Sequence, residues 1–199
     1  MRSKPRLVGI VLTRTSMLLP AMQHDRRSFF SDEPFSVPIV VSHFGSRPII
    51  DGLVKPDGID LHVTVVHPSE MFWRQLHFQE FDLSEMSMSS LIMAVEHGDT
   101  RWVGIPIFTS RRFFHAGVLV RSDSGIEKPE DLKGKRIGCP EYQLTACVWI
   151  RSMLEDDYGV RPTDVTWVRG GIEQPGRAEK IAVSLPSDIR VEQAPADRS

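Results

Sequence analysis

The sequence predicts a soluble α/β protein with a three-layer arrangement of sheet and helices. Three observations predict this class. Segments of strand type alternate with segments of helix type along the chain. Of the 199 residues, 41% are hydrophobic and 25% are charged, which is typical of a globular protein and not of a disordered one. No run approaches the ~18 consecutive apolar residues that a membrane-spanning helix needs.

Charge and cysteine content narrow the class further. Lysine and arginine number 24, aspartate and glutamate number 26, and the net charge at pH 7 is −2. A nucleic-acid-binding protein usually carries a basic excess, so this balance argues against one. Cys139 and Cys147 are the two cysteines, too few for a disulfide framework, and we interpret them as small core residues.

Residues 1–34 are predicted to form a poorly ordered extension. A basic start followed by the apolar stretch Leu7–Leu12 has the order of a secretion signal. Arg14 interrupts that stretch, however, and no Ala-x-Ala cleavage site follows. The predicted location is therefore the cytoplasm, with the periplasm as the alternative if this segment is a signal.

From Val37 the first half of the chain alternates strands and helices. Ile59–Val66 alternates apolar and polar residues as a half-buried strand does. Pro68 followed by Glu70 is typical of a helix N-terminus, and Gly98 is typical of a helix end. The predicted elements are strands at 38–43, 59–66, 81–86 and 102–108, a helix start at 48–53, a helix from 68, and a helix at 87–96.

The second half contains the most regular helix. Tyr142–Tyr158 places its apolar residues on or near one face, and Gly159 ends it. The other predicted elements are strands at 116–121, from 136 and at 165–168, a helical turn at 128–132, and less regular strands at 181–183 and 189–191.

A dense polar group follows the strand at 102–108. It contains Arg111, Arg112 and His115. Ligands of open α/β sheets bind beyond the carboxyl ends of strands. An arginine fork matches a carboxylate, and a histidine can carry a proton near neutral pH. The alternative is a solvated loop with ordinary surface arginines.

Two strand-to-helix turns are further candidate sites. Gly138–Thr145 would present free N–H groups to an anion, with Tyr142 and Thr145 adding hydroxyls, or Thr145 could simply cap the helix. In the turn at 85–90, Ser87 and Ser89 could line a cleft, or one serine could be an N-cap. Gly170 and Gly171 form a tight turn that allows close backbone approach.

Motifs for metals and nucleotides are absent from the sequence. It has no His-Glu-x-x-His, no Gly-x-Gly-x-x-Gly and no Walker loop, and no histidine pairs with a carboxylate at i, i+4 spacing. We therefore predict no metal site.

Several segments together resemble a known family. Lys128–Gly138 is similar to a segment shared by many type II periplasmic-binding-protein-like domains. Four others narrow the resemblance to the 4,5-dihydroxyphthalate decarboxylase family: Phe81–Ser90, Ile105–His115, Pro140–Arg151 and Trp167–Arg177. Their order and spacing agree with that family over about residues 37 to 195. One departure is Phe114, where the family has a basic residue and related solute-binding proteins tolerate phenylalanine.

The resemblance implies a type II periplasmic-binding-protein-like α/β fold. Two lobes with mixed sheets flanked by helices would be joined by crossover strands, with the ligand in the cleft between them. Residues 35–112 would belong to lobe 1 and residues 113–199 to lobe 2. Folds of this kind need on the order of 300 residues. We therefore expect both lobes to be incomplete at the C-terminus and the chain alone to be poorly stable and inactive.

The resemblance also implies a reaction and its residues. The family removes one carboxylate from 4,5-dihydroxyphthalate and yields protocatechuate and CO2, with no cofactor. His115, Arg111 and Arg112 would be catalytic. The residues implied to bind substrate are Ser87, Ser89, Glu141, Tyr142, Thr145, Gly170 and Gly171. The alternatives are a transporter's solute-binding protein for a small, aromatic carboxylate and an inactive remnant. The only partner expected is the small aromatic carboxylate ligand, without nucleic acid.

Overall fold

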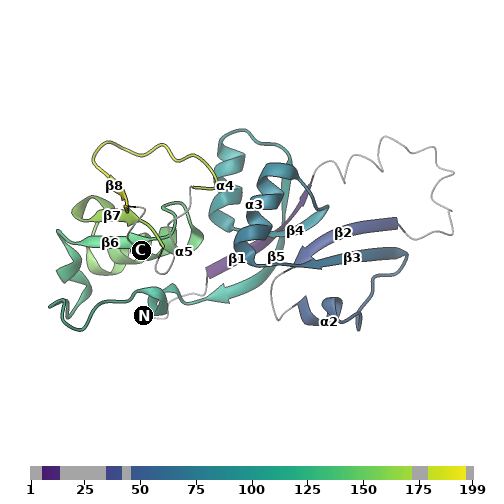
Figure 1. Cartoon of the computed structure of the whole chain (residues 1–199), viewed down its shortest axis with the longest axis horizontal. Helices are drawn as coiled ribbons and strands as arrows, with labels where there is room; N and C mark the ends of the chain where they lie inside the picture. Colours follow the sequence, from purple (N-terminus) through teal and green to yellow (C-terminus); the bar gives the residue numbers. More distant parts are fainter. Residues whose placement is uncertain (1–5, 14–34, 42–45, 172–178, 196–199) are drawn as a thin grey trace. The chain divides into compact units, whose positions relative to one another are not determined.

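A computed structural model describes residues 6–13, 35–41, 46–171 and 179–195 (Figure 1). The chain divides into two compact units, Pro5–Arg112 and Phe113–Ser199. Each unit has its own sheet. The predicted α/β class is confirmed.

The first unit contains a mixed five-stranded sheet of order β3-β2-β4-β1-β5. Its strands are β1 (Arg6–Thr13), β2 (Phe35–Val41), β3 (Ile59–Val65), β4 (Leu83–Met86) and β5 (Trp102–Arg112). β2 pairs in parallel with β3 and β4, whereas β1 pairs antiparallel with β4 and β5. Parallel pairs require a crossover connection, which α3 (Pro68–Phe78) supplies between β3 and β4.

The strand β1 corrects one prediction. Residues 1–34 were expected to lie outside the fold, yet Arg6–Thr13 is a strand between β4 and β5. The physical reason is that a short apolar stretch is typical of a sheet strand as well as of a secretion signal. Its partners lie about 70 to 105 residues further along the chain, so local pattern alone does not reveal them. The remainder of the predicted extension falls outside the described residues.

Helices of the first unit follow their sequence signals. α3 begins at Pro68, where the ring of His67 accepts a hydrogen bond from Ser69 N (3.3 Å), and it buries Met71, Phe72 and Leu76. The shorter helices are α2 (Arg47–Ile50) and α4 (Met88–Glu96). α3 packs on β4 and β2, and α4 packs on β1 and β5 (Figure 1). These contacts fix the β4–α4 turn that carries the two candidate serines.

The second unit contains a parallel three-stranded sheet of order β6-β7-β8. Its strands are β6 (Arg136–Cys139), β7 (Thr166–Arg169) and β8 (Arg190–Gln193), and α5 (Thr145–Tyr158) connects β6 to β7. Gly159 ends α5 in the left-handed conformation, φ 63°, as its position predicted. Short 3-10 turns occur at η3 (Phe114–Gly117), η4 (Pro129–Leu132) and η5 (Pro162–Asp164).

The core of this unit lies between α5 and its sheet. Trp167 of β7 is fully buried there, together with Tyr142, Cys147 and Leu154. The Trp167 indole N–H donates to the carbonyl of Pro162 over 3.0 Å, so the ring is satisfied while it is buried. The unit therefore has a core of its own.

Two predicted strands are wrong. Residues 116–121 were expected to form a strand but lie in η3 and irregular chain. Within the described residues no neighbouring strand pairs with them, so Val118 and Val120 stay exposed and Leu119 is 83% exposed. Residues 181–183 are also irregular, whereas the prediction at 189–191 corresponds to β8.

In the part of the chain that the structure describes, every helix is too short or too polar to cross a membrane.

Candidate functional site

The predicted site residues are distributed over both units. Ser87, Ser89, Arg111 and Arg112 belong to the first unit, and His115, Glu141, Tyr142, Thr145, Gly170 and Gly171 belong to the second. The structure brings them together within each unit as follows.

Ser87 and Ser89 lie at the start of α4, directly after β4. Ser87 is the N-cap residue, and its carbonyl accepts the first helical hydrogen bond from Leu91 N (3.0 Å). The hydroxyls of the two serines are 3.2 Å apart and both residues are buried. Glu85, at the end of β4, is buried in the same turn and was not singled out from the sequence. The turn thus gathers two hydroxyls and a carboxylate, and its contact with a ligand stays a prediction.

Arg111 and Arg112 are the last two residues of β5. They pair in the sheet with Leu7 and Arg6 of β1. The strand thus runs four residues beyond its predicted end at Phe108, and the alternative of a solvated loop is wrong for the backbone. The pairing of β1 is what fixes the backbone of both arginines.

His115 lies in the 3-10 turn η3 and is exposed. Its carbonyl accepts from Val118 N over 3.2 Å, which closes the turn. An exposed imidazole can exchange protons with solvent, which a general acid needs in order to recover its proton. Its catalytic role stays a prediction.

The turn between β6 and α5 was predicted to bind an anion, and a carboxylate of the chain itself lies there. Tyr142 N donates to Glu179 Oε1 over 2.6 Å, and Gln143 N donates to Oε2 over 3.3 Å. Arg169 Nη1, at the end of β7, lies 3.6 Å from the same carboxylate. The sequence did not single out Glu179 or Arg169, although Arg169 lies within the Trp167–Arg177 segment of the resemblance and Glu179 follows that segment by two residues.

Thr145 does not cap the helix. Leu144 occupies the N-cap position and Thr145 is the first helical residue, buried at the start of α5. The capping alternative is therefore wrong, because the helix begins at Thr145 itself, one residue earlier than it would if Thr145 were the N-cap.

Glu141 has an ion-pair partner within the chain. Its carboxylate pairs with Lys180, and the two side chains are 0% and 4% exposed. Gln143 Nε2 also donates to Glu141 Oε2 over 3.0 Å. These buried contacts stabilise the turn between β6 and α5. A direct contact of Glu141 with a ligand stays a prediction.

Tyr142 packs between aromatic and cationic neighbours. The guanidinium of Arg151 lies 3.7 Å from its ring centroid, and Trp167 meets it edge-on at 5.9 Å. Burial raises the pKa of Tyr142 and lowers the pKa of Arg151. The phenol therefore stays neutral at physiological pH.

Gly170 follows β7 and makes the close approach that its type predicted. Its N–H donates to the Cys139 carbonyl over 3.0 Å, and a Cβ placed on it would lie 2.9 Å from the Cβ of Ala194. Gly171 is the next residue and half-buried. Gly170 thus fixes the strand ends beside the turn.

A cavity of about 320 Å³ lies beside Glu179. It has a polar end and an apolar wall, formed by Tyr142, Arg169, Glu179, Ala182, Val183, Leu185 and Val191. Its size and mixed lining suit a small organic acid.

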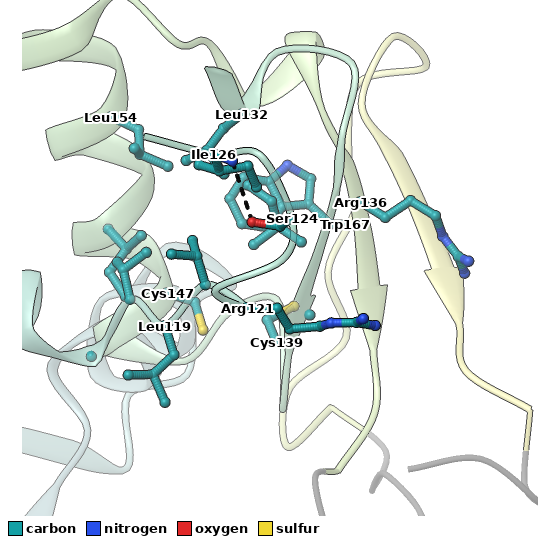
Figure 2. Close-up of a pocket in the computed structure, with 16 residues that line it drawn as sticks. Leu119, Arg121, Ser124, Ile126, Leu132, Arg136, Cys139, Cys147, Leu154 and Trp167 are labelled. Carbon is teal, nitrogen blue, oxygen red and sulfur yellow. Dashed lines mark hydrogen bonds between the residues drawn. The ribbon is translucent and has the colours of Figure 1, made fainter. Parts of the chain in front are cut away.

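A second cavity, of about 300 Å³, is mainly apolar (Figure 2). Leu119, Leu132, Leu154 and Trp167 line it together with both cysteines, while the side chains of Arg121 and Arg136 point away from the apolar group. The thiol of Cys147 donates to Cys139, which lowers the pKa of Cys139 and raises that of Cys147. Both cysteines belong to the core, as the sequence predicted. Among the described residues, no group of three or more His, Cys, Asp or Glu is placed to hold a metal ion.

The fold and the site define a class. Two compact α/β units with open sheets, and a strand-to-helix turn that holds a carboxylate, are typical of periplasmic-binding-protein-like domains that take small ligands. Residues 45–180 match the family described as "ABC transporter, phosphonate, periplasmic substrate-binding protein", and the chain belongs to this family.

Curated relatives narrow the resemblance. The chain is 48% identical over 149 residues to a 4,5-dihydroxyphthalate decarboxylase of Pseudomonas putida, covering 75% of the chain and 58% of the relative. It is 47% identical over 153 residues to a 4,5-dihydroxyphthalate decarboxylase of Comamonas testosteroni, covering 77% and 46%. The predicted resemblance to this family is confirmed. The chain spans about half the length of these relatives.

Proposed function

We propose that this chain belongs to a carboxy-lyase that acts on a small aromatic dicarboxylate, with 4,5-dihydroxyphthalate as substrate and protocatechuate and CO2 as products. The observation that carries the proposal is the 48% identity to a curated decarboxylase over 149 residues. The cavity beside Glu179, with its polar end and apolar wall, supports a ligand of this chemistry.

The reaction needs a place for the electrons of the breaking C–C bond. A ring hydroxyl para to the leaving carboxylate loses its proton and pushes an electron pair into the ring, and the ipso carbon takes up a proton from an acid. The ring is then a dienone. Loss of CO2 returns the C–C bonding pair to the ring, restores aromaticity and leaves the proton on carbon. The ring itself serves as the electron sink, so the enzyme supplies an acid and donors that hold the second carboxylate.

His115 is the proposed acid, and Arg111 and Arg112 are the proposed donors to carboxylate. An imidazole can both donate and accept a proton, so the exposed His115 side chain can deliver the proton and recover it from solvent. Arginine remains charged and matches a carboxylate with two parallel hydrogen bonds. Ser87 and Ser89 are the proposed donors to the ring hydroxyls, and their hydroxyls lie close together.

The test is turnover of 4,5-dihydroxyphthalate by the complete protein that contains this chain, followed as protocatechuate and released CO2. We expect His115→Ala to lower the rate by about 100-fold or more, the usual contribution of a positioned acid. His62→Ala, at an exposed histidine of β3, is the matched control and should turn over like the wild type. Unchanged turnover in His115→Ala would remove this residue from the mechanism.

A solute-binding protein is the second candidate function. The description of the matching family, a transporter's periplasmic substrate-binding protein, favours it. Tight binding of 4,5-dihydroxyphthalate without CO2 release would establish the receptor, whereas CO2 release would establish the enzyme. Fold alone does not decide between the two.

The cytoplasm is the proposed location. Support comes from β1, since Arg6–Thr13 pairs with two strands of the sheet. Cell fractionation tests the proposal, and recovery of the protein from the periplasm would overturn it.

A further inference from the structure

The β6–α5 turn holds a buried carboxylate that comes from far along the chain. The Glu179 side chain is only 9% exposed. Its two oxygens accept from the adjacent backbone N–H groups of Tyr142 and Gln143, with Arg169 beside them. Two consecutive N–H groups and a guanidinium form the set of donors that a carboxylate ligand would need.

Among the residues that the structure describes, positive charge exceeds negative charge around this carboxylate. Glu141 is paired with Lys180, and Glu179 lies beside Arg169. The remaining cation near Glu179 is Arg151. Its guanidinium lies on the Tyr142 ring, and burial lowers its pKa. Within the described residues, Arg151 Nη1 and Arg169 Nε are buried and have no hydrogen-bond partner. Buried donors without acceptors are rare in folded proteins, so this corner suits one more anion.

The cavity of about 320 Å³ opens on the same group. Tyr142, Arg169 and Glu179 form its polar end. Ala182, Val183, Leu185 and Val191 form an apolar wall against which a ring could lie. The combination fits a small acid that has a flat apolar body and a carboxylate at one end.

We propose that Glu179 is an internal stand-in for the carboxylate of a ligand, and that a small aromatic carboxylate entering the cavity displaces it. The ligand's oxygens take over the N–H groups of Tyr142 and Gln143 and the guanidinium of Arg169. The inference rests on the proposed function only for the aromatic nature of the ligand. The site accepts a ligand only when Glu179 has left it. The apparent affinity for the ligand therefore equals the intrinsic affinity multiplied by the fraction of molecules in which Glu179 is out of the site.

Removing the internal carboxylate should therefore tighten binding. We expect Glu179→Ala to bind phthalate at least about tenfold more tightly than the wild type by calorimetry, and Glu179→Gln to lie between them. Acetate should raise the melting temperature of Glu179→Ala more than that of the wild type, because it fills the emptied donors. Glu192→Ala is the matched control, since it removes an exposed carboxylate of the same unit that pairs with Arg136.

Two further binding measurements test whether the ligand's carboxylate and Arg169 are required. Catechol, which has the ring but lacks a carboxylate, should bind Glu179→Ala no more tightly than the wild type. Arg169→Gln should weaken phthalate binding in the Glu179→Gln background, which also serves if Glu179→Ala fails to fold. Equal or weaker phthalate binding in both Glu179 variants would overturn the inference. These binding and melting measurements do not depend on turnover. The absence of CO2 release would therefore contradict the proposed decarboxylase function but not the proposed binding site.

Discussion

Glu141 and Lys180 form a buried ion pair at the turn between β6 and α5, and a single substitution there should have a large effect on stability. Lys180→Met keeps much of the side-chain volume but leaves the Glu141 carboxylate without its charge partner in a site that is 0% exposed. Breaking a buried pair on one side destabilises a protein by about 3–5 kcal/mol. We expect a loss of this size in the free energy of unfolding, measured by urea denaturation.

The control for this pair is the exposed ion pair of Arg136 and Glu192, whose side chains are half exposed or more. Arg136→Met should change stability by less than about 1 kcal/mol, because solvent screens such pairs. The double variant Glu141→Gln with Lys180→Met should recover part of the loss, since no unpaired buried charge remains. Equal losses for Lys180→Met and Arg136→Met would contradict the argument.

Asp99 makes stability depend on pH in the acid range. Hydrogen bonds from Arg101, at 2.7 and 2.9 Å, lower its pKa to about 2, with Trp102 Nε1 adding another at 2.9 Å. An unfolded aspartate has a pKa of about 3.9. The folded pKa is the lower one, so the stabilisation is complete above about pH 4 and is lost as the pH falls toward 2.

The corresponding variant is Asp99→Asn, which cannot ionise. We expect it to lose about 2 kcal/mol of stability at pH 7 and to match the wild type near pH 2. Chemical denaturation at several pH values measures the difference. A loss of the same size at pH 7 and at pH 2 would show that the contribution of Asp99 is not electrostatic.

At the scale of elements, the predictions that succeeded rest on local signals. Pro68, Gly98 and Gly159 mark helix ends through backbone conformation, which depends on a few neighbouring residues. β1 and the segment around Leu119 were misjudged because pairing in a sheet depends on distant partners. The five-stranded order β3-β2-β4-β1-β5 places the first strand beside the last, which no local pattern reveals.

In the candidate site too, features with a local sequence signal were predicted and features that depend on distant residues were not. The turn after β6 was predicted to bind an anion from its strand-to-helix position alone. Its N–H groups donate to the carboxylate of Glu179, and binding of a ligand there stays a prediction. Glu179 escaped prediction because it reaches Tyr142 across 37 residues of chain. A long-range contact of this kind can be recognised only when the strands that carry both ends are in place.

The contact of Gly170 with Ala194 joins the ends of β7 and β8 and can be tested by a pair of substitutions. A Cβ on Gly170 would lie 2.9 Å from the Cβ of Ala194, closer than carbon atoms pack. We expect Gly170→Ala to destabilise the protein by about 1–3 kcal/mol through overpacking. Adding Ala194→Gly should restore most of the loss, because it removes the atom that clashes.

Melting temperatures of the four proteins in this cycle supply the measurement. The expected result is a coupling between the two positions, whereas independent sites would give additive effects. Additive losses would mean that strain at Gly170 arises from the backbone and not from Ala194.

At the scale of the whole molecule, the protein combines a low net charge with exposed apolar side chains. The chain carries a net charge of −2 at pH 7, with a pI near 6.4, so electrostatic repulsion between copies is weak. Leu119 is 83% exposed and its neighbours Val118 and Val120 are exposed too. Contiguous exposed apolar side chains favour association. We therefore expect the chain to self-associate, most strongly near pH 6.4.

Leu119→Lys should weaken this association by about tenfold to 100-fold, since burying one leucine contributes about 1.5–3 kcal/mol. Sedimentation at several concentrations and at pH 6.4 measures the dissociation constant. Ser187→Lys is the matched control, because it adds the same charge at an exposed position of the same unit without removing an apolar side chain. If Ser187→Lys weakens association as much as Leu119→Lys does, net charge and not the exposed leucine governs the contact between copies.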